Sequence, residues 1–565
     1  MGLTNRTDKS KRWFGLRGGW LTFWITFMCA TDMTLFGYDQ GVFSGVVISE
    51  DYLTTHGLHG PEKTNLLSII TAIYDIGCFL GAIVAFTVGE QLGRKSTILL
   101  GTTFMAVGAA LQTSSFSPAH MIVARIVSGI GNGINTSTAP IFQTETASAS
   151  WRGRLVILEM TSNILGFLLS NWINYGLSFV DSPVSWRLPL ALQFVFIALL
   201  YATVPWLPES PRWLIAHDRV DEAAVIIADL QPLTDPPAAP DDPHVVAQKR
   251  EIMFSVAYER ENGLRWRDLL SPKQPPSTSA GTKTIRRLLL GAGTQVMQQL
   301  GGINILSYYL PSLLITSVGL SDSTARLVSA CSAVTYLLAA ALAAPLVERH
   351  GRRVMMMVSS AIQFVCFLLL TILLYLAQKP GYAYQHQVAS ASVVFFFIYY
   401  MGFGLGMLGI PWLYPTEINS LPMRTKGVAI ATAANWIVNF MVVEVTPIGV
   451  QTLGWRFYIV WTVLNAVFVP LIWLVYPETG RQPFYFTVNG GENECNTLTE
   501  LVIADRTLED LDAYFRENPP LLVFRDKDAI SIKRPAKYIE MQQHDIAEAR
   551  EGGRDVEVAV DGKSQ

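Results

Sequence analysis

The stretch WLTFWITFMCATDMTLFGYDQGVFSGVVI, residues 20–48, contains no lysine or arginine and is long enough to cross a bilayer as a helix. Asp39 lies well inside it, in GYDQG. Ionisable residues inside spans are costly, usually face a water-filled path and usually have a partner. About 19 mostly polar residues precede the stretch and no small-residue cleavage site is evident, so we interpret it as a retained helix rather than a signal peptide.

Similar apolar runs recur along the chain. Its 565 residues are 50% hydrophobic and only 15% charged, whereas soluble proteins carry about a quarter charged residues. We predict an all-α membrane protein with twelve spans at about 20–46, 67–88, 97–113, 120–142, 155–179, 188–207, 286–311, 325–347, 354–377, 388–413, 427–450 and 455–476.

The distribution of basic residues predicts the orientation. Clusters follow even-numbered spans, as GRK (93–95), WRGR (151–154), GRR (351–353) and MRTK (423–426), whereas linkers after odd-numbered spans carry single basic residues. By the positive-inside rule, both termini are cytosolic. The net charge of −3 gives no indication of nucleic acid binding, and the five cysteines fit neither a paired nor a metal-ligand spacing.

The two halves of the chain repeat one pattern. GEQLGRKS (89–96) corresponds to VERHGRRV (347–354), and LPES (207–210) corresponds to YPET (476–479). Parallel repeats of this kind place a binding site between the halves, near the bilayer midplane. We divide the chain into a cytosolic tail, a six-helix half, a cytosolic linker with short helices at 218–230 and 244–261, a second six-helix half and a cytosolic tail: 1–19, 20–207, 208–285, 286–476 and 477–565.

Six motifs occur in order along the spans: GYDQG, RIVSGIGNG (125–133), PIFQTE (140–145), PESPRW (208–213), QQLGGIN (298–304) and PWLYPTE (411–417). This set resembles the sugar porter family of the major facilitator superfamily, over about 20–481. YDIGCF (74–79) and NWIVNFMVVEVTPI (435–448) are most similar to fungal members, including the yeast glycerol–proton symporter. The resemblance implies the major facilitator fold, in two six-helix halves.

Arg125 is the only basic residue deep in the fourth span. In the family, the matching Asp and Arg pair and the acid carries the coupled proton, which assigns proton coupling to Asp39 and Arg125. The alternative is a static ion pair that fixes two helices. Four other acids lie in or near spans and either join a proton path or bind neighbouring hydroxyls: Asp32, Asp75, Glu159 and Glu444.

Amide side chains suit a neutral polyhydroxyl ligand because they offer both donors and acceptors. The resemblance implies that the substrate is bound by Gln298, Gln299, Asn304, Trp412 and Asn435, and that Tyr308 and Tyr309 form an outer gate. The alternative is hydrogen bonding between spans. Met160 and Tyr336 replace amides of many hexose carriers, and GMLGIPW lacks the usual second proline, so the substrate stays open.

Charged residues at the cytosolic ends match the family's two networks: Arg94, Glu145, Arg152, Glu209 and Arg212 in one half, and Arg352, Arg353, Glu417, Arg424 and Glu478 in the other. Opposite charges of this kind can lock the inner face and release it on switching. The alternative is a role in topology alone. Gln91 stands where the family often has a basic residue, so one contact is expected to be missing.

Residues 480–503 interrupt a tail that otherwise continues from PET into ADRTLEDLD, and are either an insertion or a retained intron. GKS (562–564) lacks the glycine of a phosphate-binding loop, and no constellation suggests an enzyme. We expect a plasma-membrane secondary transporter, monomeric and without a cofactor, that couples proton entry to import of a neutral sugar or polyol. A facilitative uniporter and a non-transporting nutrient sensor are the alternatives.

Overall fold

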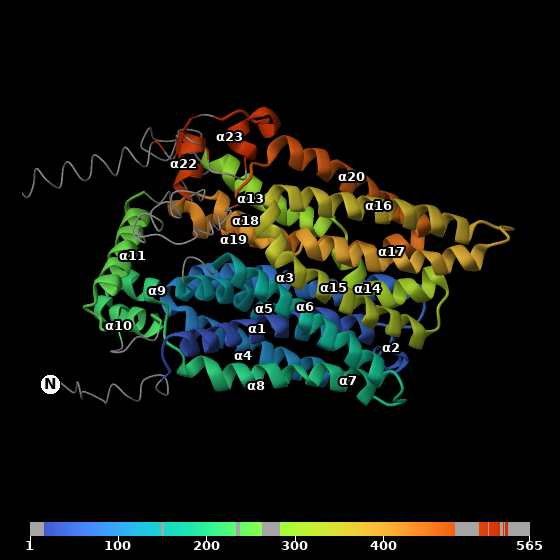
Figure 1. Cartoon of the computed structure of the whole chain (residues 1–565). Coiled ribbons are helices and arrows are strands. Elements are labelled where there is room, and N and C mark those ends of the chain that lie inside the picture. Colours follow the sequence, from blue (N-terminus) through green and yellow to red (C-terminus); the bar gives the residue numbers. More distant parts are fainter. Residues whose placement is uncertain are drawn as a thin grey trace, which may run out of the picture.

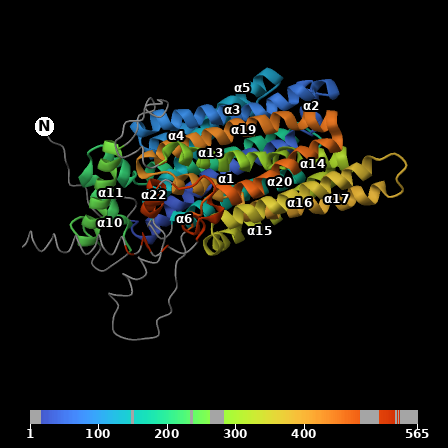
Figure 2. The same cartoon turned by 90° about the horizontal axis from the view of Figure 1, so that it is seen from above.

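The structure of the protein is a computed structural model, and it describes residues 16–147, 152–232, 238–262, 283–480, 508–517, 519–531, 535, 537–538 and 540. Long helices run side by side in one elongated bundle (Figure 1), as the view from above also shows (Figure 2). We call the end that carries α10 (Val220–Leu230) and α11 (Pro243–Asn262) the linker end, and the end that carries α2 (Glu50–His56) the distal end.

The N-terminal half contains six long helical segments, and the last of these is broken into two helices. They are α1 (Gly19–Val46), α3 (Thr64–Leu92), α4 (Arg94–Thr113), α5 (Pro118–Thr146), α6 (Arg152–Leu177) and the pair α7 (Val184–Ala191) and α8 (Gln193–Thr203). The short helix α2 covers the distal end between α1 and α3.

The C-terminal half repeats this plan but breaks two segments where the sequence predicted continuous spans. The predicted span 286–311 is α13 (Thr284–Leu300) and α14 (Ile303–Leu313), and 388–413 is α17 (Gln385–Gly406) and α18 (Ile410–Ile418). The others are α15 (Asp322–His350), α16 (Arg352–Gln378), α19 (Arg424–Leu453) and α20 (Phe457–Val475).

Helices outside the bundle gather at the linker end. α9 (Pro211–Ala216), α10 and α11 form the linker, where the sequence predicted short helices. In the C-terminal tail, α22 (Leu508–Arg516) and α23 (Lys527–Ile530) lie against the C-terminal half (Figure 1). Of the tail stretch 480–503 that the sequence singled out, residues 481–503 lie outside the described residues.

By length and composition, eight stretches of the described residues can cross a membrane. One of them, Leu421–Val475, contains both α19 and α20. The three other predicted spans are α1, α5 and the pair α13 and α14, which carry polar side chains such as Asp39, Arg125 and Gln298. Polar residues at these places lower the hydropathy of a span, and buried inside a bundle they indicate function.

Glycines let α3 and α5 pack at close range. A Cβ atom on Gly129 would lie 2.2 Å from the carbonyl oxygen of Tyr74 and 3.0 Å from Cα of Gly77. The glycines of GIGNG thus serve helix packing, as small residues commonly do in membrane bundles. This contact brings the segment around Asp75 on α3 close to Arg125 on α5.

Candidate functional site

Asp39 and Arg125 form a buried pair between α1 and α5. Asp39 Oδ1 lies 3.9 Å from Arg125 Nη1, and both side chains are fully buried. Arg125 Nη2 donates to the carbonyl of Thr71 at 3.2 Å, and the guanidinium lies over the rings of Phe43 and Tyr74, at 4.2 and 4.3 Å from their centroids. The aromatic rings therefore hold the cation without tying it to the acid.

Neither carboxylate oxygen of Asp39 makes a hydrogen bond within the part of the chain that the structure describes. Tyr74 and Gln193 face this carboxyl group, but their polar side-chain atoms also lack hydrogen bonds there. A fixed structural ion pair would be expected to have short, charge-assisted bonds. The loose geometry leaves Asp39 and Arg125 able to separate.

A break between α13 and α14 presents amides at the centre of the C-terminal half. Gly302 adopts φ +93°, which favours glycine, and a Cβ there would lie 2.9 Å from Cζ of Phe367. The carbonyl of Gly301 accepts from Tyr399 Oη at 2.8 Å and from Asn465 Nδ2 at 3.1 Å. Broken helices with their freed backbone groups held by side chains are typical of transporter binding sites.

Gln298 joins this break to the break between α17 and α18. Its Nε2 donates to the carbonyls of Met407 and Leu408 at 2.7 and 2.9 Å, while its Oε1 accepts from Asn435 Nδ2 at 2.9 Å. Trp412, on α18 just after the second break, is half-buried. The structure thus brings four predicted substrate residues, Gln298, Gln299, Asn304 and Asn435, to one region of α13, α14 and α19, with Trp412 on adjacent α18.

A chain of hydrogen bonds joins these amides to the N-terminal half. Asn304 Nδ2 donates to Gln299 Oε1 and to Asn439 Oδ1, each at 2.6 Å, and Gln40 Nε2 donates to Asn304 Oδ1 at 2.7 Å. Asn439 Nδ2 in turn donates to Asp75 Oδ1 at 2.9 Å. The chain therefore runs from the substrate amides of one half to α1 and α3 of the other.

The two tyrosines of the predicted gate lie on α14 and are buried. Tyr309 Oη donates to the carbonyl of Val443 on α19 at 3.2 Å and also lies within reach of Thr71 and Asp75 on α3 of the other half. Tyr308 lies within electrostatic reach of Asp75 and Arg125 in the other half. Tyr308 therefore faces the interface between the halves.

The other buried acids fall into separate places. Asp32 Oδ1 accepts from Asn135 Nδ2 at 2.6 Å, and Glu159 interacts electrostatically with Asp32 but makes no hydrogen bond among the described residues. Glu444 Oε1 accepts from Ser68 at 3.2 Å, across α3 and α19 and nearer the distal end. Only Asp75 joins the amide chain.

At the linker end, Glu145 and Glu209 hold the start of α4. Arg94 Nη2 lies 2.9 Å from Glu145 Oε1, and the backbone N–H groups of Arg94 and Lys95 donate to Glu209. Burial acts to raise the pKa of Glu145, but the charge and hydrogen bonds of Arg94, together with Ser210 and the charge of Arg212, outweigh it and the pKa is lowered. For Glu209, burial raises the pKa, opposed by its backbone hydrogen bonds.

The second half repeats this arrangement. Arg352 Nη2 lies 2.9 Å from Glu417 Oε1, and Glu478 accepts from the backbone N–H groups of Arg352 and Arg353 at 2.8 and 3.0 Å. Arg353 itself donates to the carbonyl of Trp473. A carboxylate on the N-terminal turn of α16 satisfies orphan N–H groups and interacts favourably with the helix dipole.

Three further residues were predicted for these networks: Arg212, Arg424 and Arg152. Arg212 pairs with Glu259 and donates to Ser255, both on α11, and its charge also acts on Glu145. Arg424 begins α19. The side chain of Arg152 lies outside the described residues. At this end, an ion pair between Arg154 Nε and Glu348 Oε1, at 3.1 Å, joins the two halves.

Comparison with known proteins then decides the family. Residues 24–487 match the family model described as "Sugar (and other) transporter". The chain belongs to this sugar transporter family. It is therefore a membrane transporter of the major facilitator superfamily and not an enzyme.

Relatives of this transporter are found among fungi. The MFS-type transporter oryC of Aspergillus oryzae is 59% identical over 97% of this chain and 95% of its own length. The sugar transporter STL1 of Saccharomyces cerevisiae is 32% identical over 84% of this chain and 81% of its own length. The expected fungal similarity is thus present, and it is much stronger to oryC than to the yeast protein.

Solved structures confirm the predicted fold. The proton:xylose symporter XylE, bound to 6-bromo-6-deoxy-D-glucose, superposes with a TM-score of 0.67 and 23% identity, over 81% of this chain and 96% of that one. An inward-open structure of the E. coli protein superposes with a TM-score of 0.63. At this identity the likeness concerns the fold.

Three residues of this transporter's amide cluster were not predicted from the sequence: Gln40, Gln295 and Asn439. Each had a signal. Gln40 directly follows Asp39, and Gln295 and Asn439 lie one helical turn from Gln299 and Asn435. Gln295 accepts from Asn435 and donates to the carbonyl of Pro411 at 2.8 Å.

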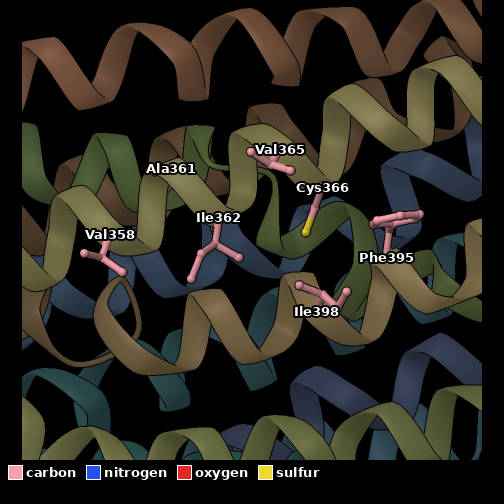
Figure 3. Close-up of a pocket in the computed structure, with 7 residues that line it drawn as sticks. All are labelled: Val358, Ala361, Ile362, Val365, Cys366, Phe395 and Ile398. Atoms are coloured by element: carbon pink, nitrogen blue, oxygen red, sulfur yellow. The ribbon is translucent and has the colours of Figure 1, made fainter.

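A pocket of about 400 Å³ between α16 and α17 lies outside this cluster (Figure 3). Its lining is entirely apolar and includes Val365, Cys366 and Phe395. Val365 is 47% exposed on the bundle surface. A pocket without a polar group cannot orient a polyhydroxyl ligand, so we do not assign it to transport.

Proposed function

We propose that the protein imports a neutral sugar or polyol by proton symport with alternating access. The observation that carries the proposal is the buried Asp39–Arg125 pair, which lacks a direct hydrogen bond and lies one residue from the amide cluster through Gln40. The similarity to a yeast sugar transporter and, in fold, to a proton:xylose symporter agrees with this substrate class.

In this proposal the coupled proton acts by binding to Asp39 and weakening its interaction with Arg125. Burial favours the neutral form of an acid, whereas a nearby guanidinium favours the carboxylate. Protonation of Asp39 from the outside releases Arg125, substrate binds, and the halves rock. Loss of the proton to the cytosol restores the pair. A membrane potential of about 100 mV contributes about 2.3 kcal/mol per charge moved, enough for about fifty-fold accumulation of a neutral solute.

The amide cluster binds the substrate in this proposal. Gln298, Gln299, Asn304 and Asn435 exchange some of their present hydrogen bonds for substrate hydroxyls, and Trp412 offers a face to the ring. Tyr308 and Tyr309 close the outer side. The linker-end networks around Glu145, Glu209, Glu417 and Glu478 hold the cytosolic side when it closes. This orientation has both termini in the cytosol and the protein in the plasma membrane.

The test uses the full chain in proteoliposomes with an imposed proton gradient. A panel of hexoses, pentoses, disaccharides and glycerol in a transporter-null host first selects the substrate. Asp39→Asn keeps the shape and removes the titration, so we expect accumulation and substrate-induced proton uptake to be lost while counterflow remains in part.

The same measurement separates the alternatives. If Asp39→Asn still concentrates substrate, Asp39 is a structural charge and the proton is carried by Asp32, Asp75 or Glu159. Transport by the wild type without proton uptake indicates a uniporter. Substrate binding without counterflow indicates a sensor.

A further inference from the structure

We infer that Asp75 is a positioning residue of the transport site, which orients the amides of Asn439 and Asn304 and helps to join the two halves at their distal side. The inference rests on the proposed function only for the substrate. The hydrogen-bond chain itself is seen in the structure, with bonds of 2.9, 2.6 and 2.7 Å from Asp75 through Asn439 and Asn304 to Gln40.

The direction of every bond in the chain follows from the chemistry of its first member. An ionised carboxylate only accepts, so Asn439 must turn its NH₂ group toward Asp75 and its oxygen toward Asn304. Asn304 must then donate to Asn439, and its own oxygen is left to accept from Gln40. One carboxylate therefore fixes the orientation of the amides at the predicted substrate site.

A protonated Asp75 would remove this constraint. A neutral carboxyl group can donate as well as accept, so Asn439 could present either end to it. The charge-assisted bond across α3 and α19 would become a neutral one, about half as strong. Protonation would thus loosen the contact between the halves and free Asn304 for substrate at the same time.

The surroundings of Asp75 couple it to the proton pair. It is fully buried on α3, one residue from Tyr74, whose ring lies against Arg125. The ionisable and charged groups that act on it come from four elements: Cys78 on α3, Asp39 on α1, Arg125 on α5, and Tyr308 and Tyr309 on α14, while Asn439 faces it from α19. Two acids thus share one guanidinium, and a low-dielectric site of this kind favours binding of one proton.

The interface that the chain joins can be observed directly. α3 and α19 also meet nearer the distal end, where Ser68 donates to Glu444 at 3.2 Å and Gln451 donates to the carbonyl of Pro61 at 3.2 Å. Glu62 and Thr452 are exposed beside the latter contact. Spin labels on Glu62→Cys and Thr452→Cys therefore report whether the halves are joined there, without any ligand.

The experiment measures the distance between these labels by pulsed electron paramagnetic resonance. The full-length protein is in nanodiscs, in a Cys331→Ala, Cys495→Ser background, at pH values from 5.5 to 8.5. We expect the wild type to shift toward longer distances as the pH falls. Asp75→Asn should show the long-distance population already at pH 8.5 and lose the dependence on pH.

A swap and a matched control separate orientation from simple charge removal. In Asp75→Asn with Asn439→Asp, the residue at 439 again only accepts, so Asn304 keeps its direction and we expect short distances at pH 8.5 to return. Glu444→Gln removes an acid from the same interface but outside the chain, and should leave the dependence on pH intact. Asn439→Asp alone puts two acids together, so the shift should occur at higher pH, which provides a test if Asp75→Asn does not fold.

Several results would overturn the inference. They are a wild type whose distances do not depend on pH, an Asp75→Asn variant that responds as the wild type does, a swap that behaves like Asp75→Asn alone, and a Glu444→Gln variant that also loses the response. Binding of glycerol, D-xylose and D-glucose to the same nanodiscs is measured in parallel. If none of the three binds, the proposed substrate class fails, while the label distances still decide the role of Asp75.

Discussion

Single side chains in this protein show how polar groups are kept inside an apolar bundle. Asn435 donates to Gln298, and Gln298 donates to the carbonyls of Met407 and Leu408 that the break between α17 and α18 frees, so both buried amides meet partners that the fold itself provides. Buried polar groups without partners are expensive, more so in a membrane than in water. Asp39 and Glu159 depart from this rule among the described residues, as functional acids often do.

At this scale we predict that Gln299→Ala and Asn304→Ala each raise the apparent KM for the best substrate at least several-fold, with surface expression retained. Both lose an amide that can bond a hydroxyl, and such a bond contributes about 1 kcal/mol or more. Asn171→Ala is the control, because Asn171 is buried but donates to Phe167 of its own helix. Unchanged KM values in both variants, measured by initial uptake rates, would place the site elsewhere.

The N-termini of α4 and α16 are capped in the same way, one in each half. Gly93 and Gly351 adopt φ +87° and +81°, and a Cβ on either would lie under 3 Å from the carboxylate of Glu209 or Glu478. The motif GRK therefore works together with PES, and GRR with PET. In each pair the glycine of the first motif leaves room for the glutamate of the second, which accepts hydrogen bonds from the first N–H groups of the helix that follows the glycine. This explains their spacing without any enzymatic role.

We predict that Glu478→Gln lowers thermal stability of the purified protein by about 1–3 kcal/mol, because Glu478 is buried and its ionised oxygens accept several backbone N–H groups. Glu209→Gln should have a smaller effect in the same assay, since its contact to Lys95 is longer, at 3.3 Å. Thermal unfolding followed by size-exclusion fluorescence measures both. Equal stability of all three proteins contradicts the capping role.

The helix α2 contains a pH-sensitive contact. His56 Nδ1 faces the carbonyl of Tyr52 at 3.0 Å and Nε2 faces the hydroxyl of Ser115 at 2.7 Å. A carbonyl only accepts, so the neutral ring carries its proton on Nδ1 and accepts from Ser115. Burial lowers the pKa of His56 from 6.5, and the charge of Arg187 adds to this, against the bond to Tyr52.

Because the pKa of His56 is lower in the folded state, the unfolded state binds more protons, and stability is lost as the pH falls below about 6.5. We predict that His56→Gln loses part of the drop in melting temperature between pH 7.5 and 5.5. His59→Gln is the control, since His59 is exposed. A drop that is identical in wild type and His56→Gln would show that this contact does not titrate.

At the linker end, segments of the C-terminal tail contact the helices of the C-terminal half. Arg287 on α13 is buried, lies 2.6 Å from Asp512 Oδ1 on α22, and donates to the carbonyl of Ile418. Glu478 N donates to the carbonyl of Ala529 at 2.8 Å. The described tail segments 508–517 and 519–531 therefore pack against the C-terminal half through specific contacts.

We predict that deletion of 480–503 leaves folding and transport unchanged, whereas Asp512→Ala lowers the melting temperature, because it leaves the buried cation of Arg287 without its carboxylate. Uptake and thermal unfolding of the two variants are compared with the wild type. Loss of transport on deletion would show that the stretch is a working part of the protein. Sequencing the mature transcript separately tests the retained-intron interpretation, which a fully abundant message encoding the stretch rejects.

The sequence by itself determined the all-helical membrane class, the two repeated halves, the family and the chemical types at the site. These rest on local signals: apolar runs of the right length, motif spacing and rare polar residues such as Asp39 and Gln299. Only the tertiary structure decided where helices break, which partner each polar group has, and that Asp75 meets Asn439. Residues 364 positions apart become neighbours only through the packing of α3 on α19, and no periodicity along the chain records such a contact.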